Sequence, residues 1–317
     1  MNLQDIGNAI AEAAPVVAEV VPTVPGRTLH IDGDGLAYFA GGNEDMTTST
    51  SRSILLGKVG NMKDACGAEK VVLHLTASGS TKGDRYAVAV TKPYQGNRTN
   101  SQRPKNWAYL RNFMLESGHP AFTVKNWHDR EADDGFGYIA TARPNDVVGT
   151  DDKDMRMLPG LHIQWRGHAL VNVPQGCFEL VVDDKTYGYK FFWWQMLRGD
   201  TADNIPGLPS HPNHKRGVGD AAATALLGEA SNNQEAYEAV RAAYKAYAPG
   251  SWDRLFCEQA SLLWMRRDRL AHLNDWLAYL GKEVAFEDFI HEAAKEQYYR
   301  VEALKAEAKT IGELSCG

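Results

Sequence analysis

The chain has 317 residues, 44% of them hydrophobic and 23% charged, which is ordinary for a globular protein of one large or two modest domains. Its net charge of −6 excludes a uniformly basic nucleic-acid binder, so any such role must rest on a local basic patch. The four cysteines lie far apart, which favours a reducing cytoplasm over a disulfide framework or a zinc site.

The beginning of the chain carries no sign of export or membrane insertion. No apolar run reaches the ~20 residues that a membrane-spanning helix needs, so we expect no membrane partner. Residues 1–26 lack the basic segment of a signal peptide and contain three prolines. We expect a short helix and then a flexible lead-in over these residues.

Strand and helix patterns alternate in the next part of the chain. This alternation predicts an α/β fold for residues 27–186, with a mainly parallel central sheet flanked by helices. Residues 162–165 and 178–182 predict a small antiparallel addition. From residue 187 to 317 we expect a helical C-terminal part. The predicted strands are 28–31, 70–76, 121–127 and 146–150, and the predicted helices are 106–118, 131–142, 234–247, 252–273 and 285–308.

Acidic residues follow the predicted strands at the points where those strands end. Parallel strands bring their carboxyl ends to one edge of a sheet, where ligands bind in open α/β folds. One such motif alone is typical of a solvated helix start, but together the motifs predict a single acidic edge. Its members are Asp32; Glu131, Asp133 and Asp134; Asp152 and Asp154; and Asp200 and Asp203, in the stretch GDTADNIPG.

Such an edge calls for cations. Carboxylates within ~4–6 Å repel one another and raise one another's pKa. Oxygen ligands without histidine or cysteine favour Mg²⁺ or Mn²⁺. Two such ions, ~3.5–4 Å apart, hold the attacking water and the leaving oxygen in phosphodiester hydrolysis. The acidic edge therefore predicts a site for two divalent ions.

Residues 77–106 form a concentrated basic stretch in this acidic protein. Six Lys and Arg side chains stand against the single Asp84, and Tyr86 and Tyr94 are interleaved with them. Alone, such a stretch is also typical of a solvated loop. Because it follows the second strand, beside the acidic edge, we predict a flap that holds phosphates and bases of a substrate.

A glycine turn, Gly217-Val218-Gly219, precedes the helical pattern DAAATALL. Such a turn presents backbone N–H groups to a phosphate. A lone GxG is usually only a helix start, but the preceding NIPGLP makes a helix-hairpin-helix candidate that grips a DNA backbone without reading its sequence.

Taken together, these motifs resemble the flap endonuclease/5′–3′ exonuclease superfamily, and most closely the bacteriophage 5′–3′ exonucleases. The resemblance implies a PIN/flap-nuclease-like sheet flanked by helices, with an arch over the active site at about 77–106. It also implies a helix-hairpin-helix-like motif in the helical part, with K⁺ as a candidate ion there. The motifs are DGDGLAY (32–38), PYQGNR (93–98), EADD (131–134), DKDM (152–155), GDTADNIPG (199–207) and GVGDAAA (217–223).

The resemblance also assigns roles by position. The eight acidic residues of the predicted edge would be metal ligands or their close support. Arg85 and Arg98 match the arch residues that contact the scissile phosphate and the strand end, and Lys92 is a third candidate catalytic cation. The candidate DNA contacts are Lys82, Tyr94, Arg103, Lys105, Lys215, Arg216, Gly217, Val218 and Gly219.

Three features depart from the family pattern. The segment after the second strand, LTASGS (75–80), has no carboxylate. Gln95 stands after Tyr94 where the family has a lysine, so either Lys92 or Lys82 substitutes for it or the arch contributes less to catalysis. The segment SHPNHKR (210–216) is inserted into the hairpin.

We therefore expect a metal-dependent 5′–3′ exonuclease or flap endonuclease that hydrolyses DNA from the 5′ ends of duplex or flapped DNA. A bacteriophage origin, with a role in DNA replication or host DNA breakdown in the bacterial cytoplasm, is implied by the resemblance alone. One alternative is a haloacid-dehalogenase-type phosphatase, whose nucleophile and late acidic motifs IDGDG and GDTAD also resemble. The second is a non-catalytic DNA-binding accessory protein with the same fold.

Overall fold

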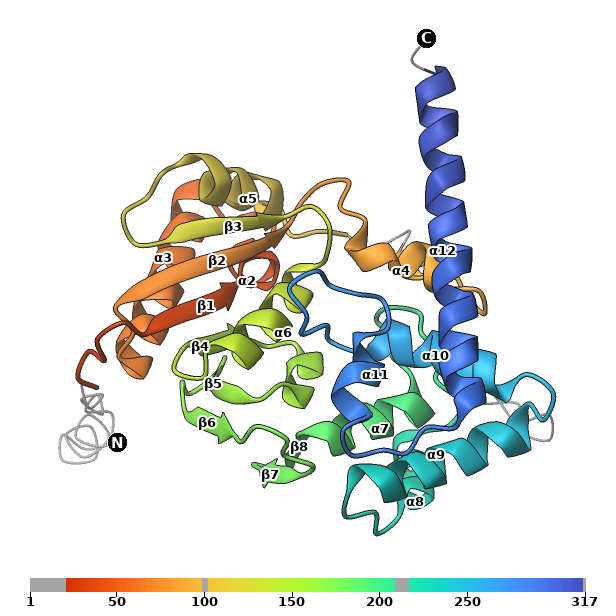
Figure 1. Ribbon diagram of the computed structural model, residues 1–317. Coiled ribbons are helices and arrows are strands. Elements are labelled where there is room, and N and C mark those ends of the chain that lie inside the picture. The colour runs from red at the N-terminus through yellow and green to blue at the C-terminus, as the bar shows by residue number, and fades with distance from the viewer. Residues whose placement is uncertain (1–20, 99–101, 209–216, 316–317) are drawn as a thin grey trace.

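A six-stranded sheet forms the centre of the N-terminal part of the molecule (Figure 1). The computed structural model describes residues 21–98, 102–208 and 217–315. The strand order is β3-β2-β1-β4-β5-β6; the first five are parallel, and β6 runs antiparallel to β5. The strands are β1 (Thr28–Asp32), β2 (Lys70–Thr76), β3 (Thr123–Trp127), β4 (Val147–Thr150), β5 (Gly160–Gln164) and β6 (Leu170–Val173).

The order of the strands creates a switch point between β1 and β4. From β1 the chain builds β2 and β3 on one side, then crosses to build β4 and β5 on the other. Crevices at such points are the ligand sites of open parallel sheets. Asp32, the last residue of β1, and the segment after Thr150, the last residue of β4, therefore share this crevice.

Helices cover both faces of the sheet. On one face, α2 (Gly33–Ala40), α3 (Thr48–Cys66) and α5 (Trp107–Glu116) bury apolar side chains of β1 and β2, with Leu29 and Leu73 fully buried. On the other face, α6 (Ala132–Ala142) packs Phe136 against His74 of β2, with ring centroids 4.8 Å apart.

The C-terminal part consists of helices that pack on the α6 face (Figure 1). One hydrophobic cluster runs from Phe136 and Val148 to Trp193 and Phe256, so it continues across residue 187, the predicted limit of the α/β part. None of the described helices is long and apolar enough to cross a membrane. The helices are α7 (Tyr189–Arg198), α8 (Asp220–Leu227), α9 (Asn233–Tyr247), α10 (Trp252–Leu263), α11 (Asp275–Leu280) and α12 (Asp288–Ser315).

A buried ion pair joins the basic stretch to both parts of the molecule. Arg85, the first residue of the short helix α4 (Arg85–Val88), donates from both terminal nitrogens to Asp134 of α6, at 2.6 and 2.9 Å. Its remaining donors reach the carbonyls of Leu262, Trp264 and Lys82, at 3.1, 3.0 and 3.3 Å. The long helix α12 runs beside α4 (Figure 1), and its Arg300 donates to two α4 carbonyls.

The predicted α/β class, the mainly parallel sheet and the helical C-terminal part are confirmed, and the structure corrects two details. Residues 162–165 lie in and just after β5, which pairs in parallel with β4 and antiparallel with β6. Residues 180–182 do not pair with it but form a separate antiparallel hairpin of β7 (Leu180–Val182) and β8 (Lys185–Tyr187). Of the lead-in, residues 1–20 lie outside the described residues. Val24 and Gly26 are bonded to the core through Gly67 O and the Glu69 carboxylate, each at 2.8 Å.

The second correction concerns the helix predicted over 252–273, which ends at Leu263. The Arg266-Arg267 pair that follows is buried, because acidic side chains replace the helical hydrogen bonds there. The Arg266 N–H donates to Asp134 at 3.1 Å, and the Arg267 N–H donates to Asp275 at 2.6 Å. Tertiary partners thus end a helix that local propensity would continue.

We predict that Asp134→Ala lowers the free energy of unfolding by about 3–5 kcal/mol, because it leaves the fully buried Arg85 with only the more distant Glu131, at 3.5 Å, as an acidic partner. Urea denaturation measures this cost. Glu296→Ala is the matched control, since it breaks the exposed pair with Arg254 and should cost less than about 1 kcal/mol. Equal costs for the two variants would show that the buried pair does not hold the two parts together.

Candidate active site at the switch point

A cleft of about 830 Å³ lies at the carboxyl ends of β1, β2 and β4. Its walls come from α2, α5, the start of α6 and part of the basic stretch. Five of the eight predicted acidic residues line it, namely Asp32, Glu131, Asp133, Asp152 and Asp203.

Three of these carboxylates, which we call the central triad, are Asp32, Asp133 and Asp152. Asp32 caps α2 and accepts from Gly35 N–H at 2.8 Å, while Asp152 caps a 3₁₀ turn (Lys153–Met157) and accepts from Asp154 N–H at 2.9 Å. Asp133 lies in the first turn of α6. Among the described residues, no Lys or Arg forms an ion pair with any member of the triad.

The triad members raise one another's pKa. Burial and the charge of Asp152 raise the pKa of Asp32 to about 6. Burial and the charges of Asp152 and Asp32 raise the pKa of Asp133 well above its usual range. Desolvation and the charges of Asp203 and Asp200 raise the pKa of Asp152, while the charge of Lys153 opposes them. The triad is thus a focus of negative charge that has no ion-pair partner of its own among the described residues.

Around the triad, three cation–carboxylate pairs line the same cleft, and we call them the ring pairs. Lys82 pairs with Glu131, with 3.2 Å between the amine and the nearer oxygen. Arg98 pairs with Asp203, and Arg111 of α5 pairs with Asp34 of α2. Each basic side chain of a ring pair is therefore neutralised by one acid while standing within reach of a ligand in the cleft.

Tyr94 and Gln95 hold the basic stretch against the acidic edge through hydrogen bonds. The Tyr94 hydroxyl lies 2.7 Å from a Glu131 oxygen and 2.9 Å from an Asp203 oxygen. The Gln95 amide donates to the same two carboxylates, at 3.3 and 2.9 Å. Gln95, at the position where the family pattern has lysine, thus bridges the two acids without adding charge, and Lys82 bonds its side-chain oxygen.

The turn GDTADNIPG presents its two acids to different partners. Gly199 and Gly207 both have positive φ, and a Cβ on Gly207 would stand 2.2 Å from Gly199 N, so both positions require glycine. Within the turn, Asp200 and Ile205 exchange two backbone hydrogen bonds. Asp203 faces the cleft. Asp200 is buried beside Lys153, whose amine lies 3.0 Å from Asp200 and 3.1 Å from Asp154.

Several predicted roles are corrected by these positions. Arg85, predicted to contact the phosphate, and Asp134, predicted as a metal ligand or its close support, are buried in their mutual ion pair. Neither side chain lines the cleft. Tyr94 is buried with its hydroxyl engaged, so its ring is not placed to stack on a base. Lys92 and Lys105 are exposed and do not line the cleft.

Other predicted residues stay predictions. Arg103 lines the cleft. Gly217 and Gly219 are exposed, and Val218 packs partly against the core, just before α8 begins. Lys215 and Arg216 lie outside the described residues.

Sequence reasoning missed Asp34, Arg111 and Lys153. Asp34 stands in the quoted motif DGDGLAY, and Lys153 stands between two predicted ligands, so both positions carried a signal. Arg111 stands in an ordinary helical pattern, and only the packing of α5 beside α2 brings it to the cleft.

The triad has the donor chemistry that hard divalent cations prefer, since it offers carboxylate oxygens whose raised pKa values reflect missing positive charge. In the described part of the chain, no three acidic, histidine or cysteine side chains already surround one point as metal ligands. The triad thus fits a divalent cation by donor type and charge, whereas its present geometry does not gather three ligands around one point. Asp154 and Asp200 are instead compensated by Lys153.

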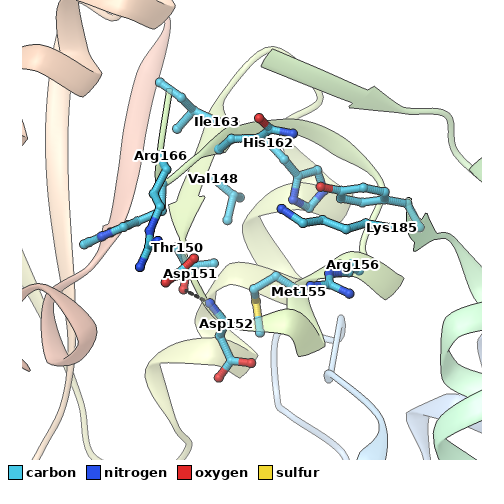
Figure 2. A pocket seen from close by; sticks show the side chains of 13 residues that line it. Val148, Thr150, Asp151, Asp152, Met155, Arg156, His162, Ile163, Arg166 and Lys185 are labelled. Atoms are coloured by element: carbon cyan, nitrogen blue, oxygen red, sulfur yellow. Dashed lines mark hydrogen bonds between the residues drawn. The ribbon is translucent and has the colours of Figure 1, made fainter. Parts of the chain in front are cut away.

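A smaller pocket of about 110 Å³ lies beside Asp151 and Asp152 and is lined by Arg156, Lys185 and Tyr187 (Figure 2). In Figure 2 the Asp152 carboxylate points away from Lys185, while its N–H donates to Thr150 Oγ1 at 3.0 Å. Asp152 is thus held from its backbone and directs its carboxylate away from this basic pocket.

The fold is similar to that of two solved bacteriophage T5 structures. The T5 flap endonuclease, solved as a pseudo-enzyme–product complex with DNA and metal ions, has a TM-score of 0.53 and 15% identity, over 87% of this chain and 99% of that one. The T5 5′-exonuclease with bound zinc ions has a TM-score of 0.52 and 16% identity, over 87% of this chain and all of that one. No protein-family model and no curated protein matches the sequence. At these identities the likeness establishes the fold that the motifs predicted.

We predict that Asp32→Asn stabilises the metal-free protein at pH 7.5 by about 2–5 °C in Tm and has little effect at pH 4. An acid whose folded pKa is raised stabilises the fold below its unfolded pKa, here 3.8, and loses that contribution as pH rises through about 6. Thermal unfolding in EDTA measures the difference, and Mg²⁺ should stabilise the native protein more than the variant.

Asp64→Asn, an exposed acid on α3, is the control, because it should leave Tm unchanged at both pH values. Equal melting of Asp32→Asn and the native protein across this range would show that the triad carries no electrostatic strain.

Proposed function

We propose that this chain is a metal-dependent nuclease that hydrolyses phosphodiesters at the 5′ ends of duplex or flapped DNA, as a 5′–3′ exonuclease or flap endonuclease. The carrying observation is the central triad of Asp32, Asp133 and Asp152, unpaired at the sheet's switch point and surrounded by basic side chains. A cleft that offers acids to cations and cations to phosphates suits a phosphodiester better than a neutral substrate.

The triad would hold the divalent cation, Mg²⁺ or Mn²⁺, with Glu131 and Asp203 as close support. When bound, such ions offset the charge that develops on the phosphate and lower the pKa of the attacking water. A second ion at Asp154 and Asp200 requires Lys153 to leave the position between them. The two-ion arrangement is therefore part of the proposal, and its second site is the one that must rearrange.

The chain's own cations position the phosphate. Lys82, 20% exposed and over the cleft, and Arg98 would exchange their carboxylate partners for phosphate oxygens and stabilise the charge that develops there. Lys82 is better placed for this role than Lys92, which lies outside the cleft. The Gly217–Gly219 turn, with Lys215, Arg216 and K⁺, would hold the duplex backbone. A bacteriophage origin and action in the bacterial cytoplasm remain part of this proposal.

We predict that the protein releases labelled products from 5′-end-labelled flap, nicked or blunt duplexes in Mg²⁺, and that Asp133→Asn slows cleavage about 100-fold or more. DNA affinity in EDTA should stay within about threefold of the native protein. Asp64→Asn should cleave normally.

Other outcomes point to other functions. Release of phosphate from small phosphomonoesters, abolished by Asp32→Asn, would favour a phosphatase. DNA binding without hydrolysis in Mg²⁺ and Mn²⁺ would favour an accessory protein.

A matched pair of lysine variants tests the arch. We predict that Lys82→Ala lowers kcat about 10²–10³-fold, because it removes a charge beside the developing phosphate charge. Lys92→Ala should stay close to the native rate, since that side chain is exposed away from the cleft. Single-turnover cleavage separates this effect from binding, and the opposite ranking of the two variants would assign the catalytic lysine to Lys92.

A further inference from the structure

Arg111 enters the cleft from α5 and is held there by three groups. Its Nη2 donates to the Thr76 carbonyl at 2.7 Å, its other terminal nitrogen pairs with Asp34, and its guanidinium carbon lies 5.1 Å from the Trp107 ring centroid. The side chain is 13% exposed, and it lines the same cleft as the triad. Its position is thus fixed, while part of the guanidinium remains open to the cleft.

Asp34 fixes this guanidinium to the sheet. One oxygen of Asp34 accepts the Thr76 N–H at 2.9 Å, and the other pairs with Arg111. Thr76, the last residue of β2, therefore donates its backbone N–H to Asp34 and accepts a hydrogen bond from Arg111 at its carbonyl oxygen. β1 ends on an acid and β4 is followed by acids, whereas β2 ends without one and presents a cation instead.

Arg111 also belongs to a stack that forms one wall of the cleft. Two guanidinium groups lie over the Trp107 indole, with the central carbon of Arg103 at 4.0 Å and that of Arg111 at 5.1 Å from the ring centroid. All three residues line the cleft. A guanidinium group that packs against an aromatic ring can still donate from its free N–H groups, and these match the oxygens of a phosphate.

The charge balance favours an anionic ligand for this wall. Asp34 neutralises Arg111, but Arg103 lies on Trp107 with no acidic partner among the described residues. Arginine stays charged at neutral pH, and a phosphate can accept two of its parallel N–H groups. A strand whose scissile phosphate lies at the triad has neighbouring phosphates within the same cleft, because strand phosphates repeat every few ångströms.

We propose that Arg111 binds a backbone phosphate of the DNA strand next to the triad, with Asp34 as its positioning residue and the Arg103–Trp107–Arg111 stack as the strand-binding wall. This inference rests on the proposed nuclease function. On this inference the end of β2, which has no acid, contributes a contact to the substrate through Arg111 rather than a ligand to a cation.

Fluorescence anisotropy with a labelled 5′-flap duplex in EDTA, over about 50–300 mM KCl, tests the contact without cleavage. Arg111→Gln should weaken binding about 10-fold at low salt and reduce the slope of log K against log salt by about 1. Arg111→Lys should retain most of the slope, because it keeps the charge. Arg254→Gln, which removes an exposed arginine of α10, should leave both quantities unchanged.

Asp34→Asn separates positioning from charge. It should leave the salt slope intact, because Arg111 remains, while it raises KM in Mg²⁺-supported cleavage through a less ordered guanidinium. Thermal unfolding of each variant checks that the fold is retained, and the KM of Asp34→Asn carries the test if Arg111→Gln does not fold.

The outcomes distinguish this inference from the function on which it rests. If the native protein binds and cleaves the flap substrate but Arg111→Gln has the native affinity and salt slope, Arg111 is a structural residue and the inference is overturned. If the native protein neither binds nor cleaves DNA, the proposed function fails, and the inference falls with it.

Discussion

Mutual repulsion among carboxylates at the sheet's switch point is the constraint on which the rest of the structure depends. Parallel pairing places the ends of β1 and β4 side by side, so Asp32 and Asp152 meet there with Asp133 from α6. Such a group is costly in a metal-free protein, and its raised pKa values express that cost. The basic side chains around the cleft offset part of this negative charge.

The residues of the acidic edge fall into two groups. Some of the acids form an ion pair with a basic side chain. Asp134 pairs with Arg85 in the interior, and Asp203 pairs with Arg98 at the cleft. Among the described residues, the triad acids form no ion pair with a Lys or Arg. This division separates acids that hold the fold together from acids that have no ion-pair partner among the described residues, although Asp133 and Asp134 are adjacent in sequence.

The same ion pairs connect the acidic edge to the distant parts of the chain. Asp134 accepts from Arg85 in the basic stretch and from Arg266 after α10, so the α/β part and the helical part meet at one buried carboxylate. Tyr94 and Gln95 join the basic stretch to both Glu131 and Asp203. Entry of a substrate strand would therefore compete with contacts that already order the cleft.

The sequence alone determined the parallel core of the sheet, several helices and the strand ends that carry acidic residues, because hydrophobic periodicity and strand ends are local properties. Only the tertiary structure decided which acid faces which partner. On α6, Asp134 pairs with the buried Arg85, whereas its neighbour Asp133 lines the cleft. Helix α5 brings Arg111 to Asp34 across 77 positions of sequence. Such choices depend on the distances and the burial of charges from separate elements, so no local pattern records them.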